Sequence, residues 1–282
     1  MRNWIKKSKG TTRWAASLIM LTLIAVSITI TGCGGSSGGG GLSGRITESG
    51  STTVQPLADV LATAYMQVNP GVTVIIQGGG SAAGIKAAND GTVDIGASSR
   101  ELTTSDPTLV THLLGYDGIA IITNTGNSIS GLTKQQVRDI FDGNVTNWNQ
   151  VGGADHTITI VCREEGSGTR TSFEGVVMSG QNISKRAILQ TSNGALKTSV
   201  SGTPYSIGYL SLGYIDSTVK SLTFDGIACT AANIKNKTYP VSHPLYFLTK
   251  TQATGIVKDF IDYCTGPTGQ AKVASEGYIP VQ

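Results

Sequence analysis

Four short turns in this chain of 282 residues combine glycines with Ser and Thr hydroxyls, which suits the binding of a small anion. Each turn follows a stretch typical of a β-strand, and three of them open a stretch with helical spacing. The first turn of a helix offers unpaired N–H groups and the positive end of the helix dipole, and glycine lets the backbone approach a ligand closely. The turns cover residues 50–53, 78–81, 94–100 and 163–169.

One such turn usually does no more than cap a helix, because Ser and Thr oxygens accept hydrogen bonds from the first helical N–H groups. Four turns in one chain, with Arg163 in the last, favour a shared ligand instead. Open α/β sheets bind ligands at the carboxyl ends of their strands, which is where these turns fall. The sequence therefore predicts that the turns meet around one anion.

Strand and helix patterns alternate around these turns. Short apolar runs predict strands at 44–48, 72–76 and 93–97, and apolar residues at helical spacing predict helices at 54–65 and 82–88. This order is typical of a parallel α/β sheet. Farther along, the same patterns predict strands at 118–123, 157–162, 207–210 and 219–224, and helices at 133–141, 169–177, 185–189, 252–264 and 270–275.

Nucleotide binding, catalysis and metal binding each need further residues that the sequence does not place near these turns. Segment 78–84 only partly follows the dinucleotide-binding pattern, and no P-loop lysine follows a glycine run. Ser167 has no histidine base in a known motif, and the adjacent Glu164 and Glu165 cannot flank a glycosidic bond. Carboxylates and histidines near the turns are too few for a metal cage. We therefore expect a protein that is not an enzyme and needs no cofactor or metal.

The N-terminus has the layout of a bacterial secretion signal, with basic residues in 1–13 and an apolar run over 14–31. The run ends at Cys33, and the residues before that cysteine resemble the bacterial lipobox. This pattern predicts a signal peptide over 1–32, a lipid on Cys33 and a flexible Gly/Ser tether over 33–43. A retained membrane-spanning helix and an ordinary cleaved signal are the alternatives.

The charge and the remaining cysteines exclude some partners. Five of the 21 basic residues precede residue 33 and no acidic residue does, so removing that segment leaves 16 basic and 18 acidic residues. This balance does not support nucleic-acid binding, which needs clustered Lys and Arg. Cys162, Cys229 and Cys264 match no zinc spacing. They are predicted to be buried thiols, and one disulfide of unspecified pairing is the alternative.

From about residue 44 to residue 282 the chain resembles the phosphate-binding proteins of bacterial and archaeal ABC phosphate importers. The four turns stand in the same order as that family's anion-binding loops, and the first continues as Gly50–Pro56. His243 stands where an arginine is expected in the return crossover. Further similar segments are residues 132–152, 239–246 and 277–280.

The resemblance implies an α/β fold of the two-domain periplasmic-binding-protein type, similar to type II. Each domain would contain a mixed sheet flanked by helices, with the ligand cleft between the domains. Domain I would combine residues 44–117 with 241–282, and domain II would cover 118–240. The two crossovers would act as a hinge, and closure would bury the phosphate.

The resemblance also implies which residues hold the phosphate. Asp94 would accept the proton that hydrogen phosphate carries and sulfate lacks, and its alternative role is a loop cap. Arg163 would supply a charged hydrogen bond of fixed geometry. Ser99 and Arg100 lie in a matching loop, but the resemblance does not give their contacts. The remaining donors that it implies are Thr52, Thr53, Ser81, Ser167, Gly168 and Thr169.

The predicted function is that of a lipid-anchored, extracytoplasmic and monomeric phosphate receptor. It would capture inorganic phosphate and deliver it to the membrane permease of an ABC importer. Three alternatives stay open: a receptor for another oxyanion such as sulfate, molybdate or tungstate, a phosphate-ester hydrolase, and a sensory or adhesive surface protein that kept the fold.

Overall fold

A path of hydrogen-bonded strands runs through the computed structural model, which describes residues 41–281. In path order the strands are β2 (Gly71–Gly78), β1 (Ser43–Gly50), β3 (Ile95–Ser98), β10 (Ser242–Thr249), β4 (Val110–Asn124), β8 (Ser206–Ser211), β6 (Thr159–Arg163) and β7 (Ile188–Gln190). β1 is parallel to β2 and β3, and β6 is parallel to β7 and β8. β10 and β4 pair with antiparallel neighbours. The predicted α/β class with mixed sheets is confirmed.

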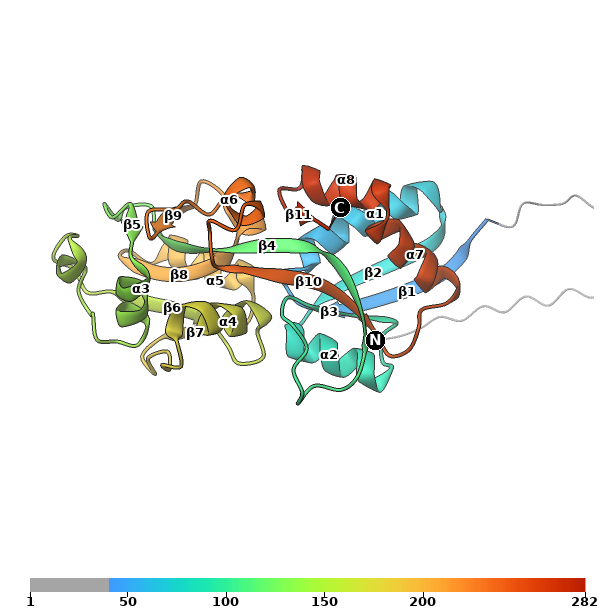
Figure 1. The fold of residues 1–282 in the computed structure, drawn as a ribbon, viewed down its shortest axis with the longest axis horizontal. Helices are drawn as coiled ribbons and strands as arrows, with labels where there is room; N and C mark the ends of the chain where they lie inside the picture. Colours follow the sequence, from blue (N-terminus) through green and yellow to red (C-terminus); the bar gives the residue numbers. More distant parts are fainter. Residues whose placement is uncertain (1–40, 282) are drawn as a thin grey trace, which may run out of the picture. The chain divides into compact units, whose positions relative to one another are not determined.

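β4 and β10 are the long strands that connect the two ends of this path. They lie side by side in Figure 1 and pair from Ser242 opposite Gly118 to Thr249 opposite Val110. Beyond Gly118, β4 pairs instead with β8 and with β9 (Val219–Phe224). β4 therefore extends from the strands around β3 into those around β8, which is why the predicted strand 118–123 is only its last part. The short strands β5 (Gly131–Leu132) and β11 (Ile279–Pro280) complete the sheet.

The buried apolar side chains form two large clusters, here called the first core and the second core. The first core draws on two stretches of the chain, residues 46–114 and 245–278. The second core comes from residues 119–241, with Ile279 added. Each sheet region needs its own apolar cover because a sheet face is stabilised only when it is packed against another layer.

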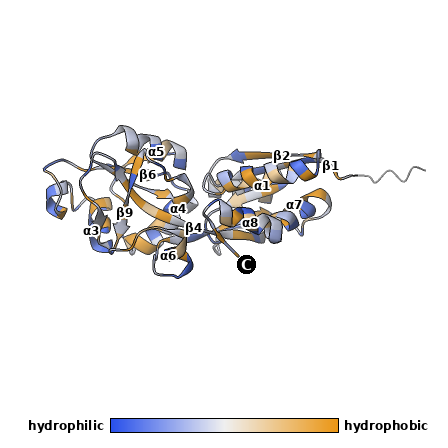
Figure 2. Cartoon of the chain, turned by 90° about the horizontal axis from the view of Figure 1, so that it is seen from above, coloured by the Kyte–Doolittle hydropathy of each residue, from blue (hydrophilic) through white to orange (hydrophobic). Residues whose placement is uncertain are grey.

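Four helices lie against the strands of the first core: α1 (Gln55–Val68), α2 (Ser81–Asp90), α7 (Gly255–Thr265) and α8 (Pro267–Ser275). α1 buries Leu57, Leu61 and Tyr65 at helical spacing, whereas Val68 is exposed. Figure 2 shows hydrophobic and hydrophilic colours alternating along α1, as expected of an amphipathic helix. α1 begins at a proline-containing first turn and ends before Pro70, which cannot continue it.

The helices of the second core are α3 (Lys134–Phe141), α4 (Gly168–Phe173), α5 (Asn193–Gly202) and α6 (Ala231–Lys235). α3 lies within the helix predicted at 133–141, and a capping box between Thr133 and Gln136 fixes its start. The helix predicted at 185–189 is wrong, because that stretch leads into strand β7 and the next helix, α5, begins only at Asn193. Pairing of β7 with β6 outweighs the weak helical spacing of so short a segment.

A buried polar group joins the two long strands at the point where they pass between the cores. Asp117 of β4 accepts hydrogen bonds from its neighbour's backbone, Gly118 N–H, and from the Ser211 hydroxyl. His243 Nε2 of β10 lies 3.3 Å from Asp117 Oδ2, and both side chains are buried. His243 therefore packs against Asp117 inside the crossover, which is a structural role.

The three cysteines predicted to be buried thiols are free and buried in the structure: Cys162, Cys229 and Cys264. Burial raises the pKa of Cys162 to about 11 and that of Cys229 to about 12, so both thiols stay protonated near neutral pH. Among the described residues no helix is long and apolar enough to cross a membrane. The predicted signal peptide and Cys33 lie outside the described residues.

Candidate functional site

The turns that follow β1, β2, β3 and β6 meet in one cluster of buried polar side chains. The turn after β7 joins them. We call this set the hydroxyl cluster, and its polar members are each no more than 6% exposed: Ser51, Thr52, Thr53, Ser81, Ser99, Arg163, Ser167, Thr169 and Asn193.

Hydrogen bonds tie the three turns on the side of the first core together. The Ser51 hydroxyl donates to Ser99 Oγ over 2.9 Å, and Ser99 N–H donates to Ser81 Oγ over 3.1 Å. Gly50 makes this approach possible, because its φ is +150° and a Cβ there would lie 2.3 Å from the carbonyl oxygen of Ala97. Only glycine fits both the space and this backbone conformation.

Capping does not account for the first two turns. α1 and α2 have no side-chain cap at their N-termini, so the hydroxyls of Thr52, Thr53 and Ser81 are not used to hold a helix start. Ser167, in contrast, caps α4 by accepting a hydrogen bond from Arg170 N–H. Helix capping therefore explains the Ser167 hydroxyl of the fourth turn, but it does not explain the hydroxyls of the first two turns.

Contacts across the cluster link the turns beside the first core to those beside the second core. Thr53 Oγ1 lies 2.7 Å from Thr169 Oγ1, and Asn193 Nδ2 donates to Thr53 Oγ1 over 2.8 Å. The Tyr214 hydroxyl donates to the carbonyl of Thr52 over 2.6 Å. Hydroxyls from β1–α1 and from β6–α4 therefore face one another at hydrogen-bonding distance.

Gly168 sits at a close approach between the two sides. A Cβ at this position would lie 2.4 Å from Ser81 Oγ and 2.7 Å from Ser99 Oγ. Real Cβ contacts do not come so close, so any larger residue would push the fourth turn away from the second and third. Glycine is required here by the space between the turns.

Arg163 places a positive charge in this buried setting. Its side chain is 1% exposed, Nε donates to the carbonyl of Gln190 over 3.2 Å, and Nη2 donates to that of Thr191 over 3.0 Å. Among residues 41–281 no carboxylate forms an ion pair with it. Burial lowers the pKa of Arg163, but a guanidinium stays charged in proteins. A buried charge without a counterion is costly, so this site is suited to an anion.

Asp94 is not part of the hydroxyl cluster, and this corrects the predicted site. It precedes β3, where its carboxylate accepts hydrogen bonds from Thr47 N–H over 2.7 Å and from Thr47 Oγ1 over 2.8 Å. The cluster lies past the other end of β3, beyond Ser98, and β3 is about 13 Å long at about 3.3 Å per residue. Asp94 is exposed and caps the start of a strand, as the alternative interpretation has it.

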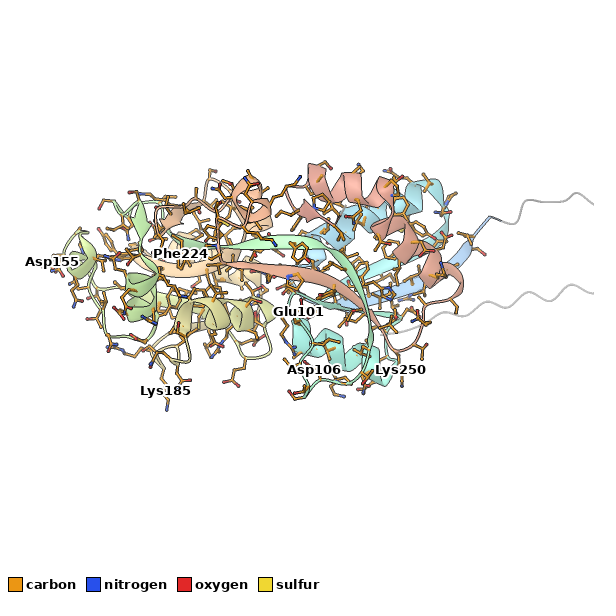
Figure 3. The ribbon with its side chains drawn as sticks, viewed as in Figure 1. Glu101, Asp106, Asp155, Lys185, Phe224 and Lys250 are labelled. Atoms are coloured by element: carbon orange, nitrogen blue, oxygen red, sulfur yellow. The ribbon has the colours of Figure 1, made fainter. Side chains whose placement is uncertain are left out.

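The sequence left the contacts of Ser99 and Arg100 open, and the structure places only one of them in the cluster. Ser99 belongs to the cluster, as described above. Arg100 instead forms a two-fold ion pair with Asp106, at 2.7 and 2.9 Å. Figure 3 labels Asp106 at this loop. This pairing holds the pKa of Asp106 well below its usual range. Arg163 is therefore the arginine of the cluster.

Asn193 is a cluster residue that the sequence analysis missed. It is the first residue of α5, directly after the capping residue Ser192, and is fully buried. Its signal was the segment Thr191–Gly194, a small-residue turn between a strand and a helix like the other four. The wrongly predicted helix at 185–189 concealed this turn.

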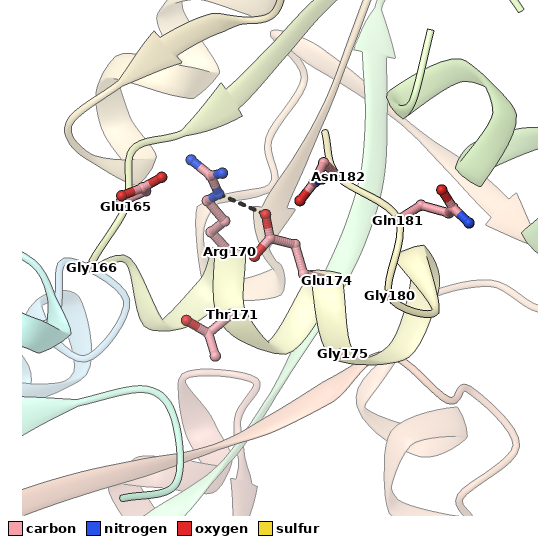
Figure 4. Close-up of a pocket in the computed structure, with 9 residues that line it drawn as sticks. All are labelled: Glu165, Gly166, Arg170, Thr171, Glu174, Gly175, Gly180, Gln181 and Asn182. Atoms are coloured by element: carbon pink, nitrogen blue, oxygen red, sulfur yellow. Dashed lines mark hydrogen bonds and ion pairs between the residues drawn. The ribbon is translucent and has the colours of Figure 1, made fainter. Parts of the chain in front are cut away.

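A pocket on the outer side of the fourth turn fits an anion less well. Its lining comes from that turn, from α4, from the π-helical turn Glu174–Met178 and from the loop at 180–182. Figure 4 shows Arg170 pointing toward Glu174 within it. Arg170 Nε donates to Glu174 Oε1 over 2.8 Å, so its charge is already balanced. The buried hydroxyls do not line this pocket. The better anion site is the hydroxyl cluster.

Comparisons with known proteins agree with this geometry. A family model described as a PBP superfamily domain matches residues 35–268. Phosphate-binding protein PstS of Bacillus subtilis is 34% identical over 245 residues, which cover 85% of this chain and 81% of that protein. A putative phosphate ABC transporter substrate-binding protein from Clostridium perfringens, solved with bound phosphate, matches with a TM-score of 0.82 and 37% identity, over 85% of this chain and 100% of that chain. An ABC-type phosphate transport receptor from Vibrio cholerae matches with a TM-score of 0.69 and 37% identity, over 84% and 100%.

Proposed function

We propose that this chain, which belongs to the PstS family of phosphate-binding proteins within the PBP superfamily, is the receptor that captures inorganic phosphate for an ABC-type importer. Its relatives carry the names of phosphate-binding proteins, and one similar structure contains phosphate. These names describe binding proteins rather than enzymes, so the phosphate-ester hydrolase is not favoured.

The observation that carries this proposal is the buried guanidinium of Arg163, which has no carboxylate partner among residues 41–281 and is bonded to the carbonyl of Thr191, two residues before Asn193 of the hydroxyl cluster. A tetrahedral dianion would supply the missing countercharge and accept the available hydrogen bonds. The N-termini of α2, α4 and α5 add oriented N–H groups around the same point. The proposed ligand residues are Thr52, Thr53, Ser81, Ser99, Arg163, Ser167, Gly168, Thr169 and Asn193.

We assign the hinge to β4 and β10. The division into domain I (44–117 and 241–282) and domain II (118–240) is supported by the two cores, whose residues fall almost entirely on either side of these limits. The connections between the two sides are these long strands, so bending there would open the cluster to phosphate and closure would bury it.

The proposed setting is the outer face of a cell membrane, with a lipid on Cys33 as the anchor. The receptor would act as a monomer and hand phosphate to the permease of the importer. The basic and apolar N-terminal sequence that ends at Cys33 supports this part of the proposal. Mass spectrometry of the mature N-terminus tests it: a diacylglyceryl-modified Cys33 is expected, and a chain that retains residues 1–32 would contradict it.

Isothermal titration calorimetry tests the binding function. The protein is unfolded and refolded beforehand to remove phosphate carried from the cell, and phosphate and sulfate are then titrated in parallel. One-to-one phosphate binding with a Kd of about 1 μM or tighter, or about −8 kcal/mol, is the expected result. Binding of sulfate, molybdate or tungstate in preference to phosphate would favour the other oxyanion receptor, and no heat with any of them would reject the site.

A further inference from the structure

We propose that Asn193 Oδ1 accepts the proton that a bound phosphate carries, so that the receptor recognises a protonated tetrahedral oxyanion through a neutral amide. This inference rests on the proposed phosphate-binding function and assigns the residue that separates phosphate from sulfate within it.

The amide of Asn193 is held in the cluster from one side only. Its Nδ2 donates to Thr53 Oγ1 over 2.8 Å and lies 3.4 Å from Thr52 Oγ1. Oδ1 of the same amide is fully buried and has no hydrogen-bond partner among the described residues. A buried polar atom without a partner is costly in a folded protein, so this oxygen is expected to face a donor when the ligand is bound.

Asn193 Oδ1 is also unusual in its chemistry within the cluster. The other ligand groups are hydroxyls, backbone N–H groups and a guanidinium, all of which can donate to an oxyanion. An amide oxygen can only accept. It therefore suits a ligand oxygen that carries a hydrogen.

The described part of the chain places no carboxylate in this role. Asp94 lies past the far end of β3 and is bound to Thr47. Asp117, although buried, is bound by Ser211 and Gly118 in the crossover. Among residues 41–281 no Asp or Glu carboxylate is hydrogen-bonded to any member of the cluster. The discrimination that an acidic residue would provide must come from a neutral acceptor.

A neutral acceptor predicts a particular selectivity. Both ions that phosphate forms near neutral pH keep at least one O–H, whereas sulfate has none. An acceptor that faces a sulfate oxygen stays unpaired, but it adds no like-charge repulsion. Phosphate should therefore bind about tenfold to a hundredfold more tightly than sulfate, and arsenate, which is also protonated, should bind like phosphate.

The experiment measures the ratio of the sulfate Kd to the phosphate Kd by calorimetry, in the wild type, Asn193→Asp and Asn193→Ala. Asn193→Asp supplies a charged acceptor, so phosphate binding should persist and the ratio should rise at least tenfold. Asn193→Ala removes the acceptor, so the ratio should fall toward one. Tyr214→Phe is the control, because it removes another contact across the cluster, the bond to Thr52 O, and should weaken both anions equally. Thermal unfolding of each anion-free variant checks that it folds.

The outcomes separate this inference from the proposed function. A wild type that binds no phosphate would reject both. A wild type that binds phosphate, with the same ratio in Asn193→Ala as in Tyr214→Phe, would reject the acceptor role alone. Loss of phosphate binding in a folded Asn193→Asp would show that the amide donates to the ligand and would also overturn the inference.

Discussion

Replacement of Arg163 by methionine is expected to weaken phosphate binding without unfolding the protein. In the anion-free protein, several kcal/mol of desolvation cost at this buried guanidinium are offset by its two hydrogen bonds to carbonyls, each worth about 1.5–3 kcal/mol. These contributions nearly cancel. Methionine fills much of the same space with an apolar side chain, so the free energy of unfolding without phosphate should change by no more than about 1 kcal/mol.

The effect on binding should be much larger. Removing one partner of a buried, hydrogen-bonded charge pair costs about 2–5 kcal/mol, which corresponds to a Kd about 30-fold to 4,000-fold higher. Calorimetry measures this change directly. Denaturant unfolding gives an independent check, because phosphate at 1,000 times the wild-type Kd should stabilise the wild type by about 4 kcal/mol and the variant by about 2 kcal/mol or less.

Arg100→Met is the matched control, because Arg100 belongs to the third turn but pairs with Asp106 outside the cluster. This variant should lose stability through its broken ion pair and keep its phosphate Kd within about twofold. Arg163→Met is therefore expected to change the phosphate Kd and not the stability, whereas Arg100→Met is expected to change the stability and not the phosphate Kd. An Arg163→Met variant that lost several kcal/mol of anion-free stability and still bound phosphate like the wild type would show that Arg163 is structural and does not hold the anion.

Three further predictions follow from single contacts. Gly168→Ala should weaken phosphate binding at least about 100-fold in calorimetry while the protein stays folded, because its Cβ would lie 2.4 Å from Ser81 Oγ; binding like the wild type would contradict the closed geometry. Asp94→Ala should cost about 1 kcal/mol in denaturant unfolding, through its lost bonds to Thr47, and leave the phosphate and sulfate Kd values unchanged; an altered ratio would restore Asp94 to the site. Burial raises the pKa of Glu48 from 4.5 to about 8, so the folded state holds a proton that the unfolded state releases, and stability should fall by up to several kcal/mol as the pH rises from about 4.5 to about 8. Glu48→Gln should flatten that decline in unfolding experiments at a series of pH values, and an unchanged slope would exclude Glu48 as its cause.

Local patterns in the sequence were enough to find most elements of the first core. Strands β1, β2 and β3 and helices α1 and α2 follow from apolar spacing and from glycine-rich turns, which act within a few residues of one another. The segment 185–190 misled the prediction, because its few apolar residues fit a helix as well as a strand. Its pairing with β6 decided the matter, and that pairing joins residues more than twenty positions apart.

The residues of the site were likewise predicted in part from local patterns and fixed in part by contacts between distant segments. The sequence by itself determined that several hydroxyl-bearing turns and Arg163 stand where strands end, because turn chemistry is local. Only the tertiary structure decided which residues of each turn meet. The parallel register of β3 on β1, with Ile95 opposite Glu48 and Ala97 opposite Gly50, carries Ser99 to the ligand side and leaves Asp94 at the far end. Likewise, the packing of α5 brings Asn193 against Thr53, 140 residues earlier, and no pattern within a single segment can encode a contact at that separation.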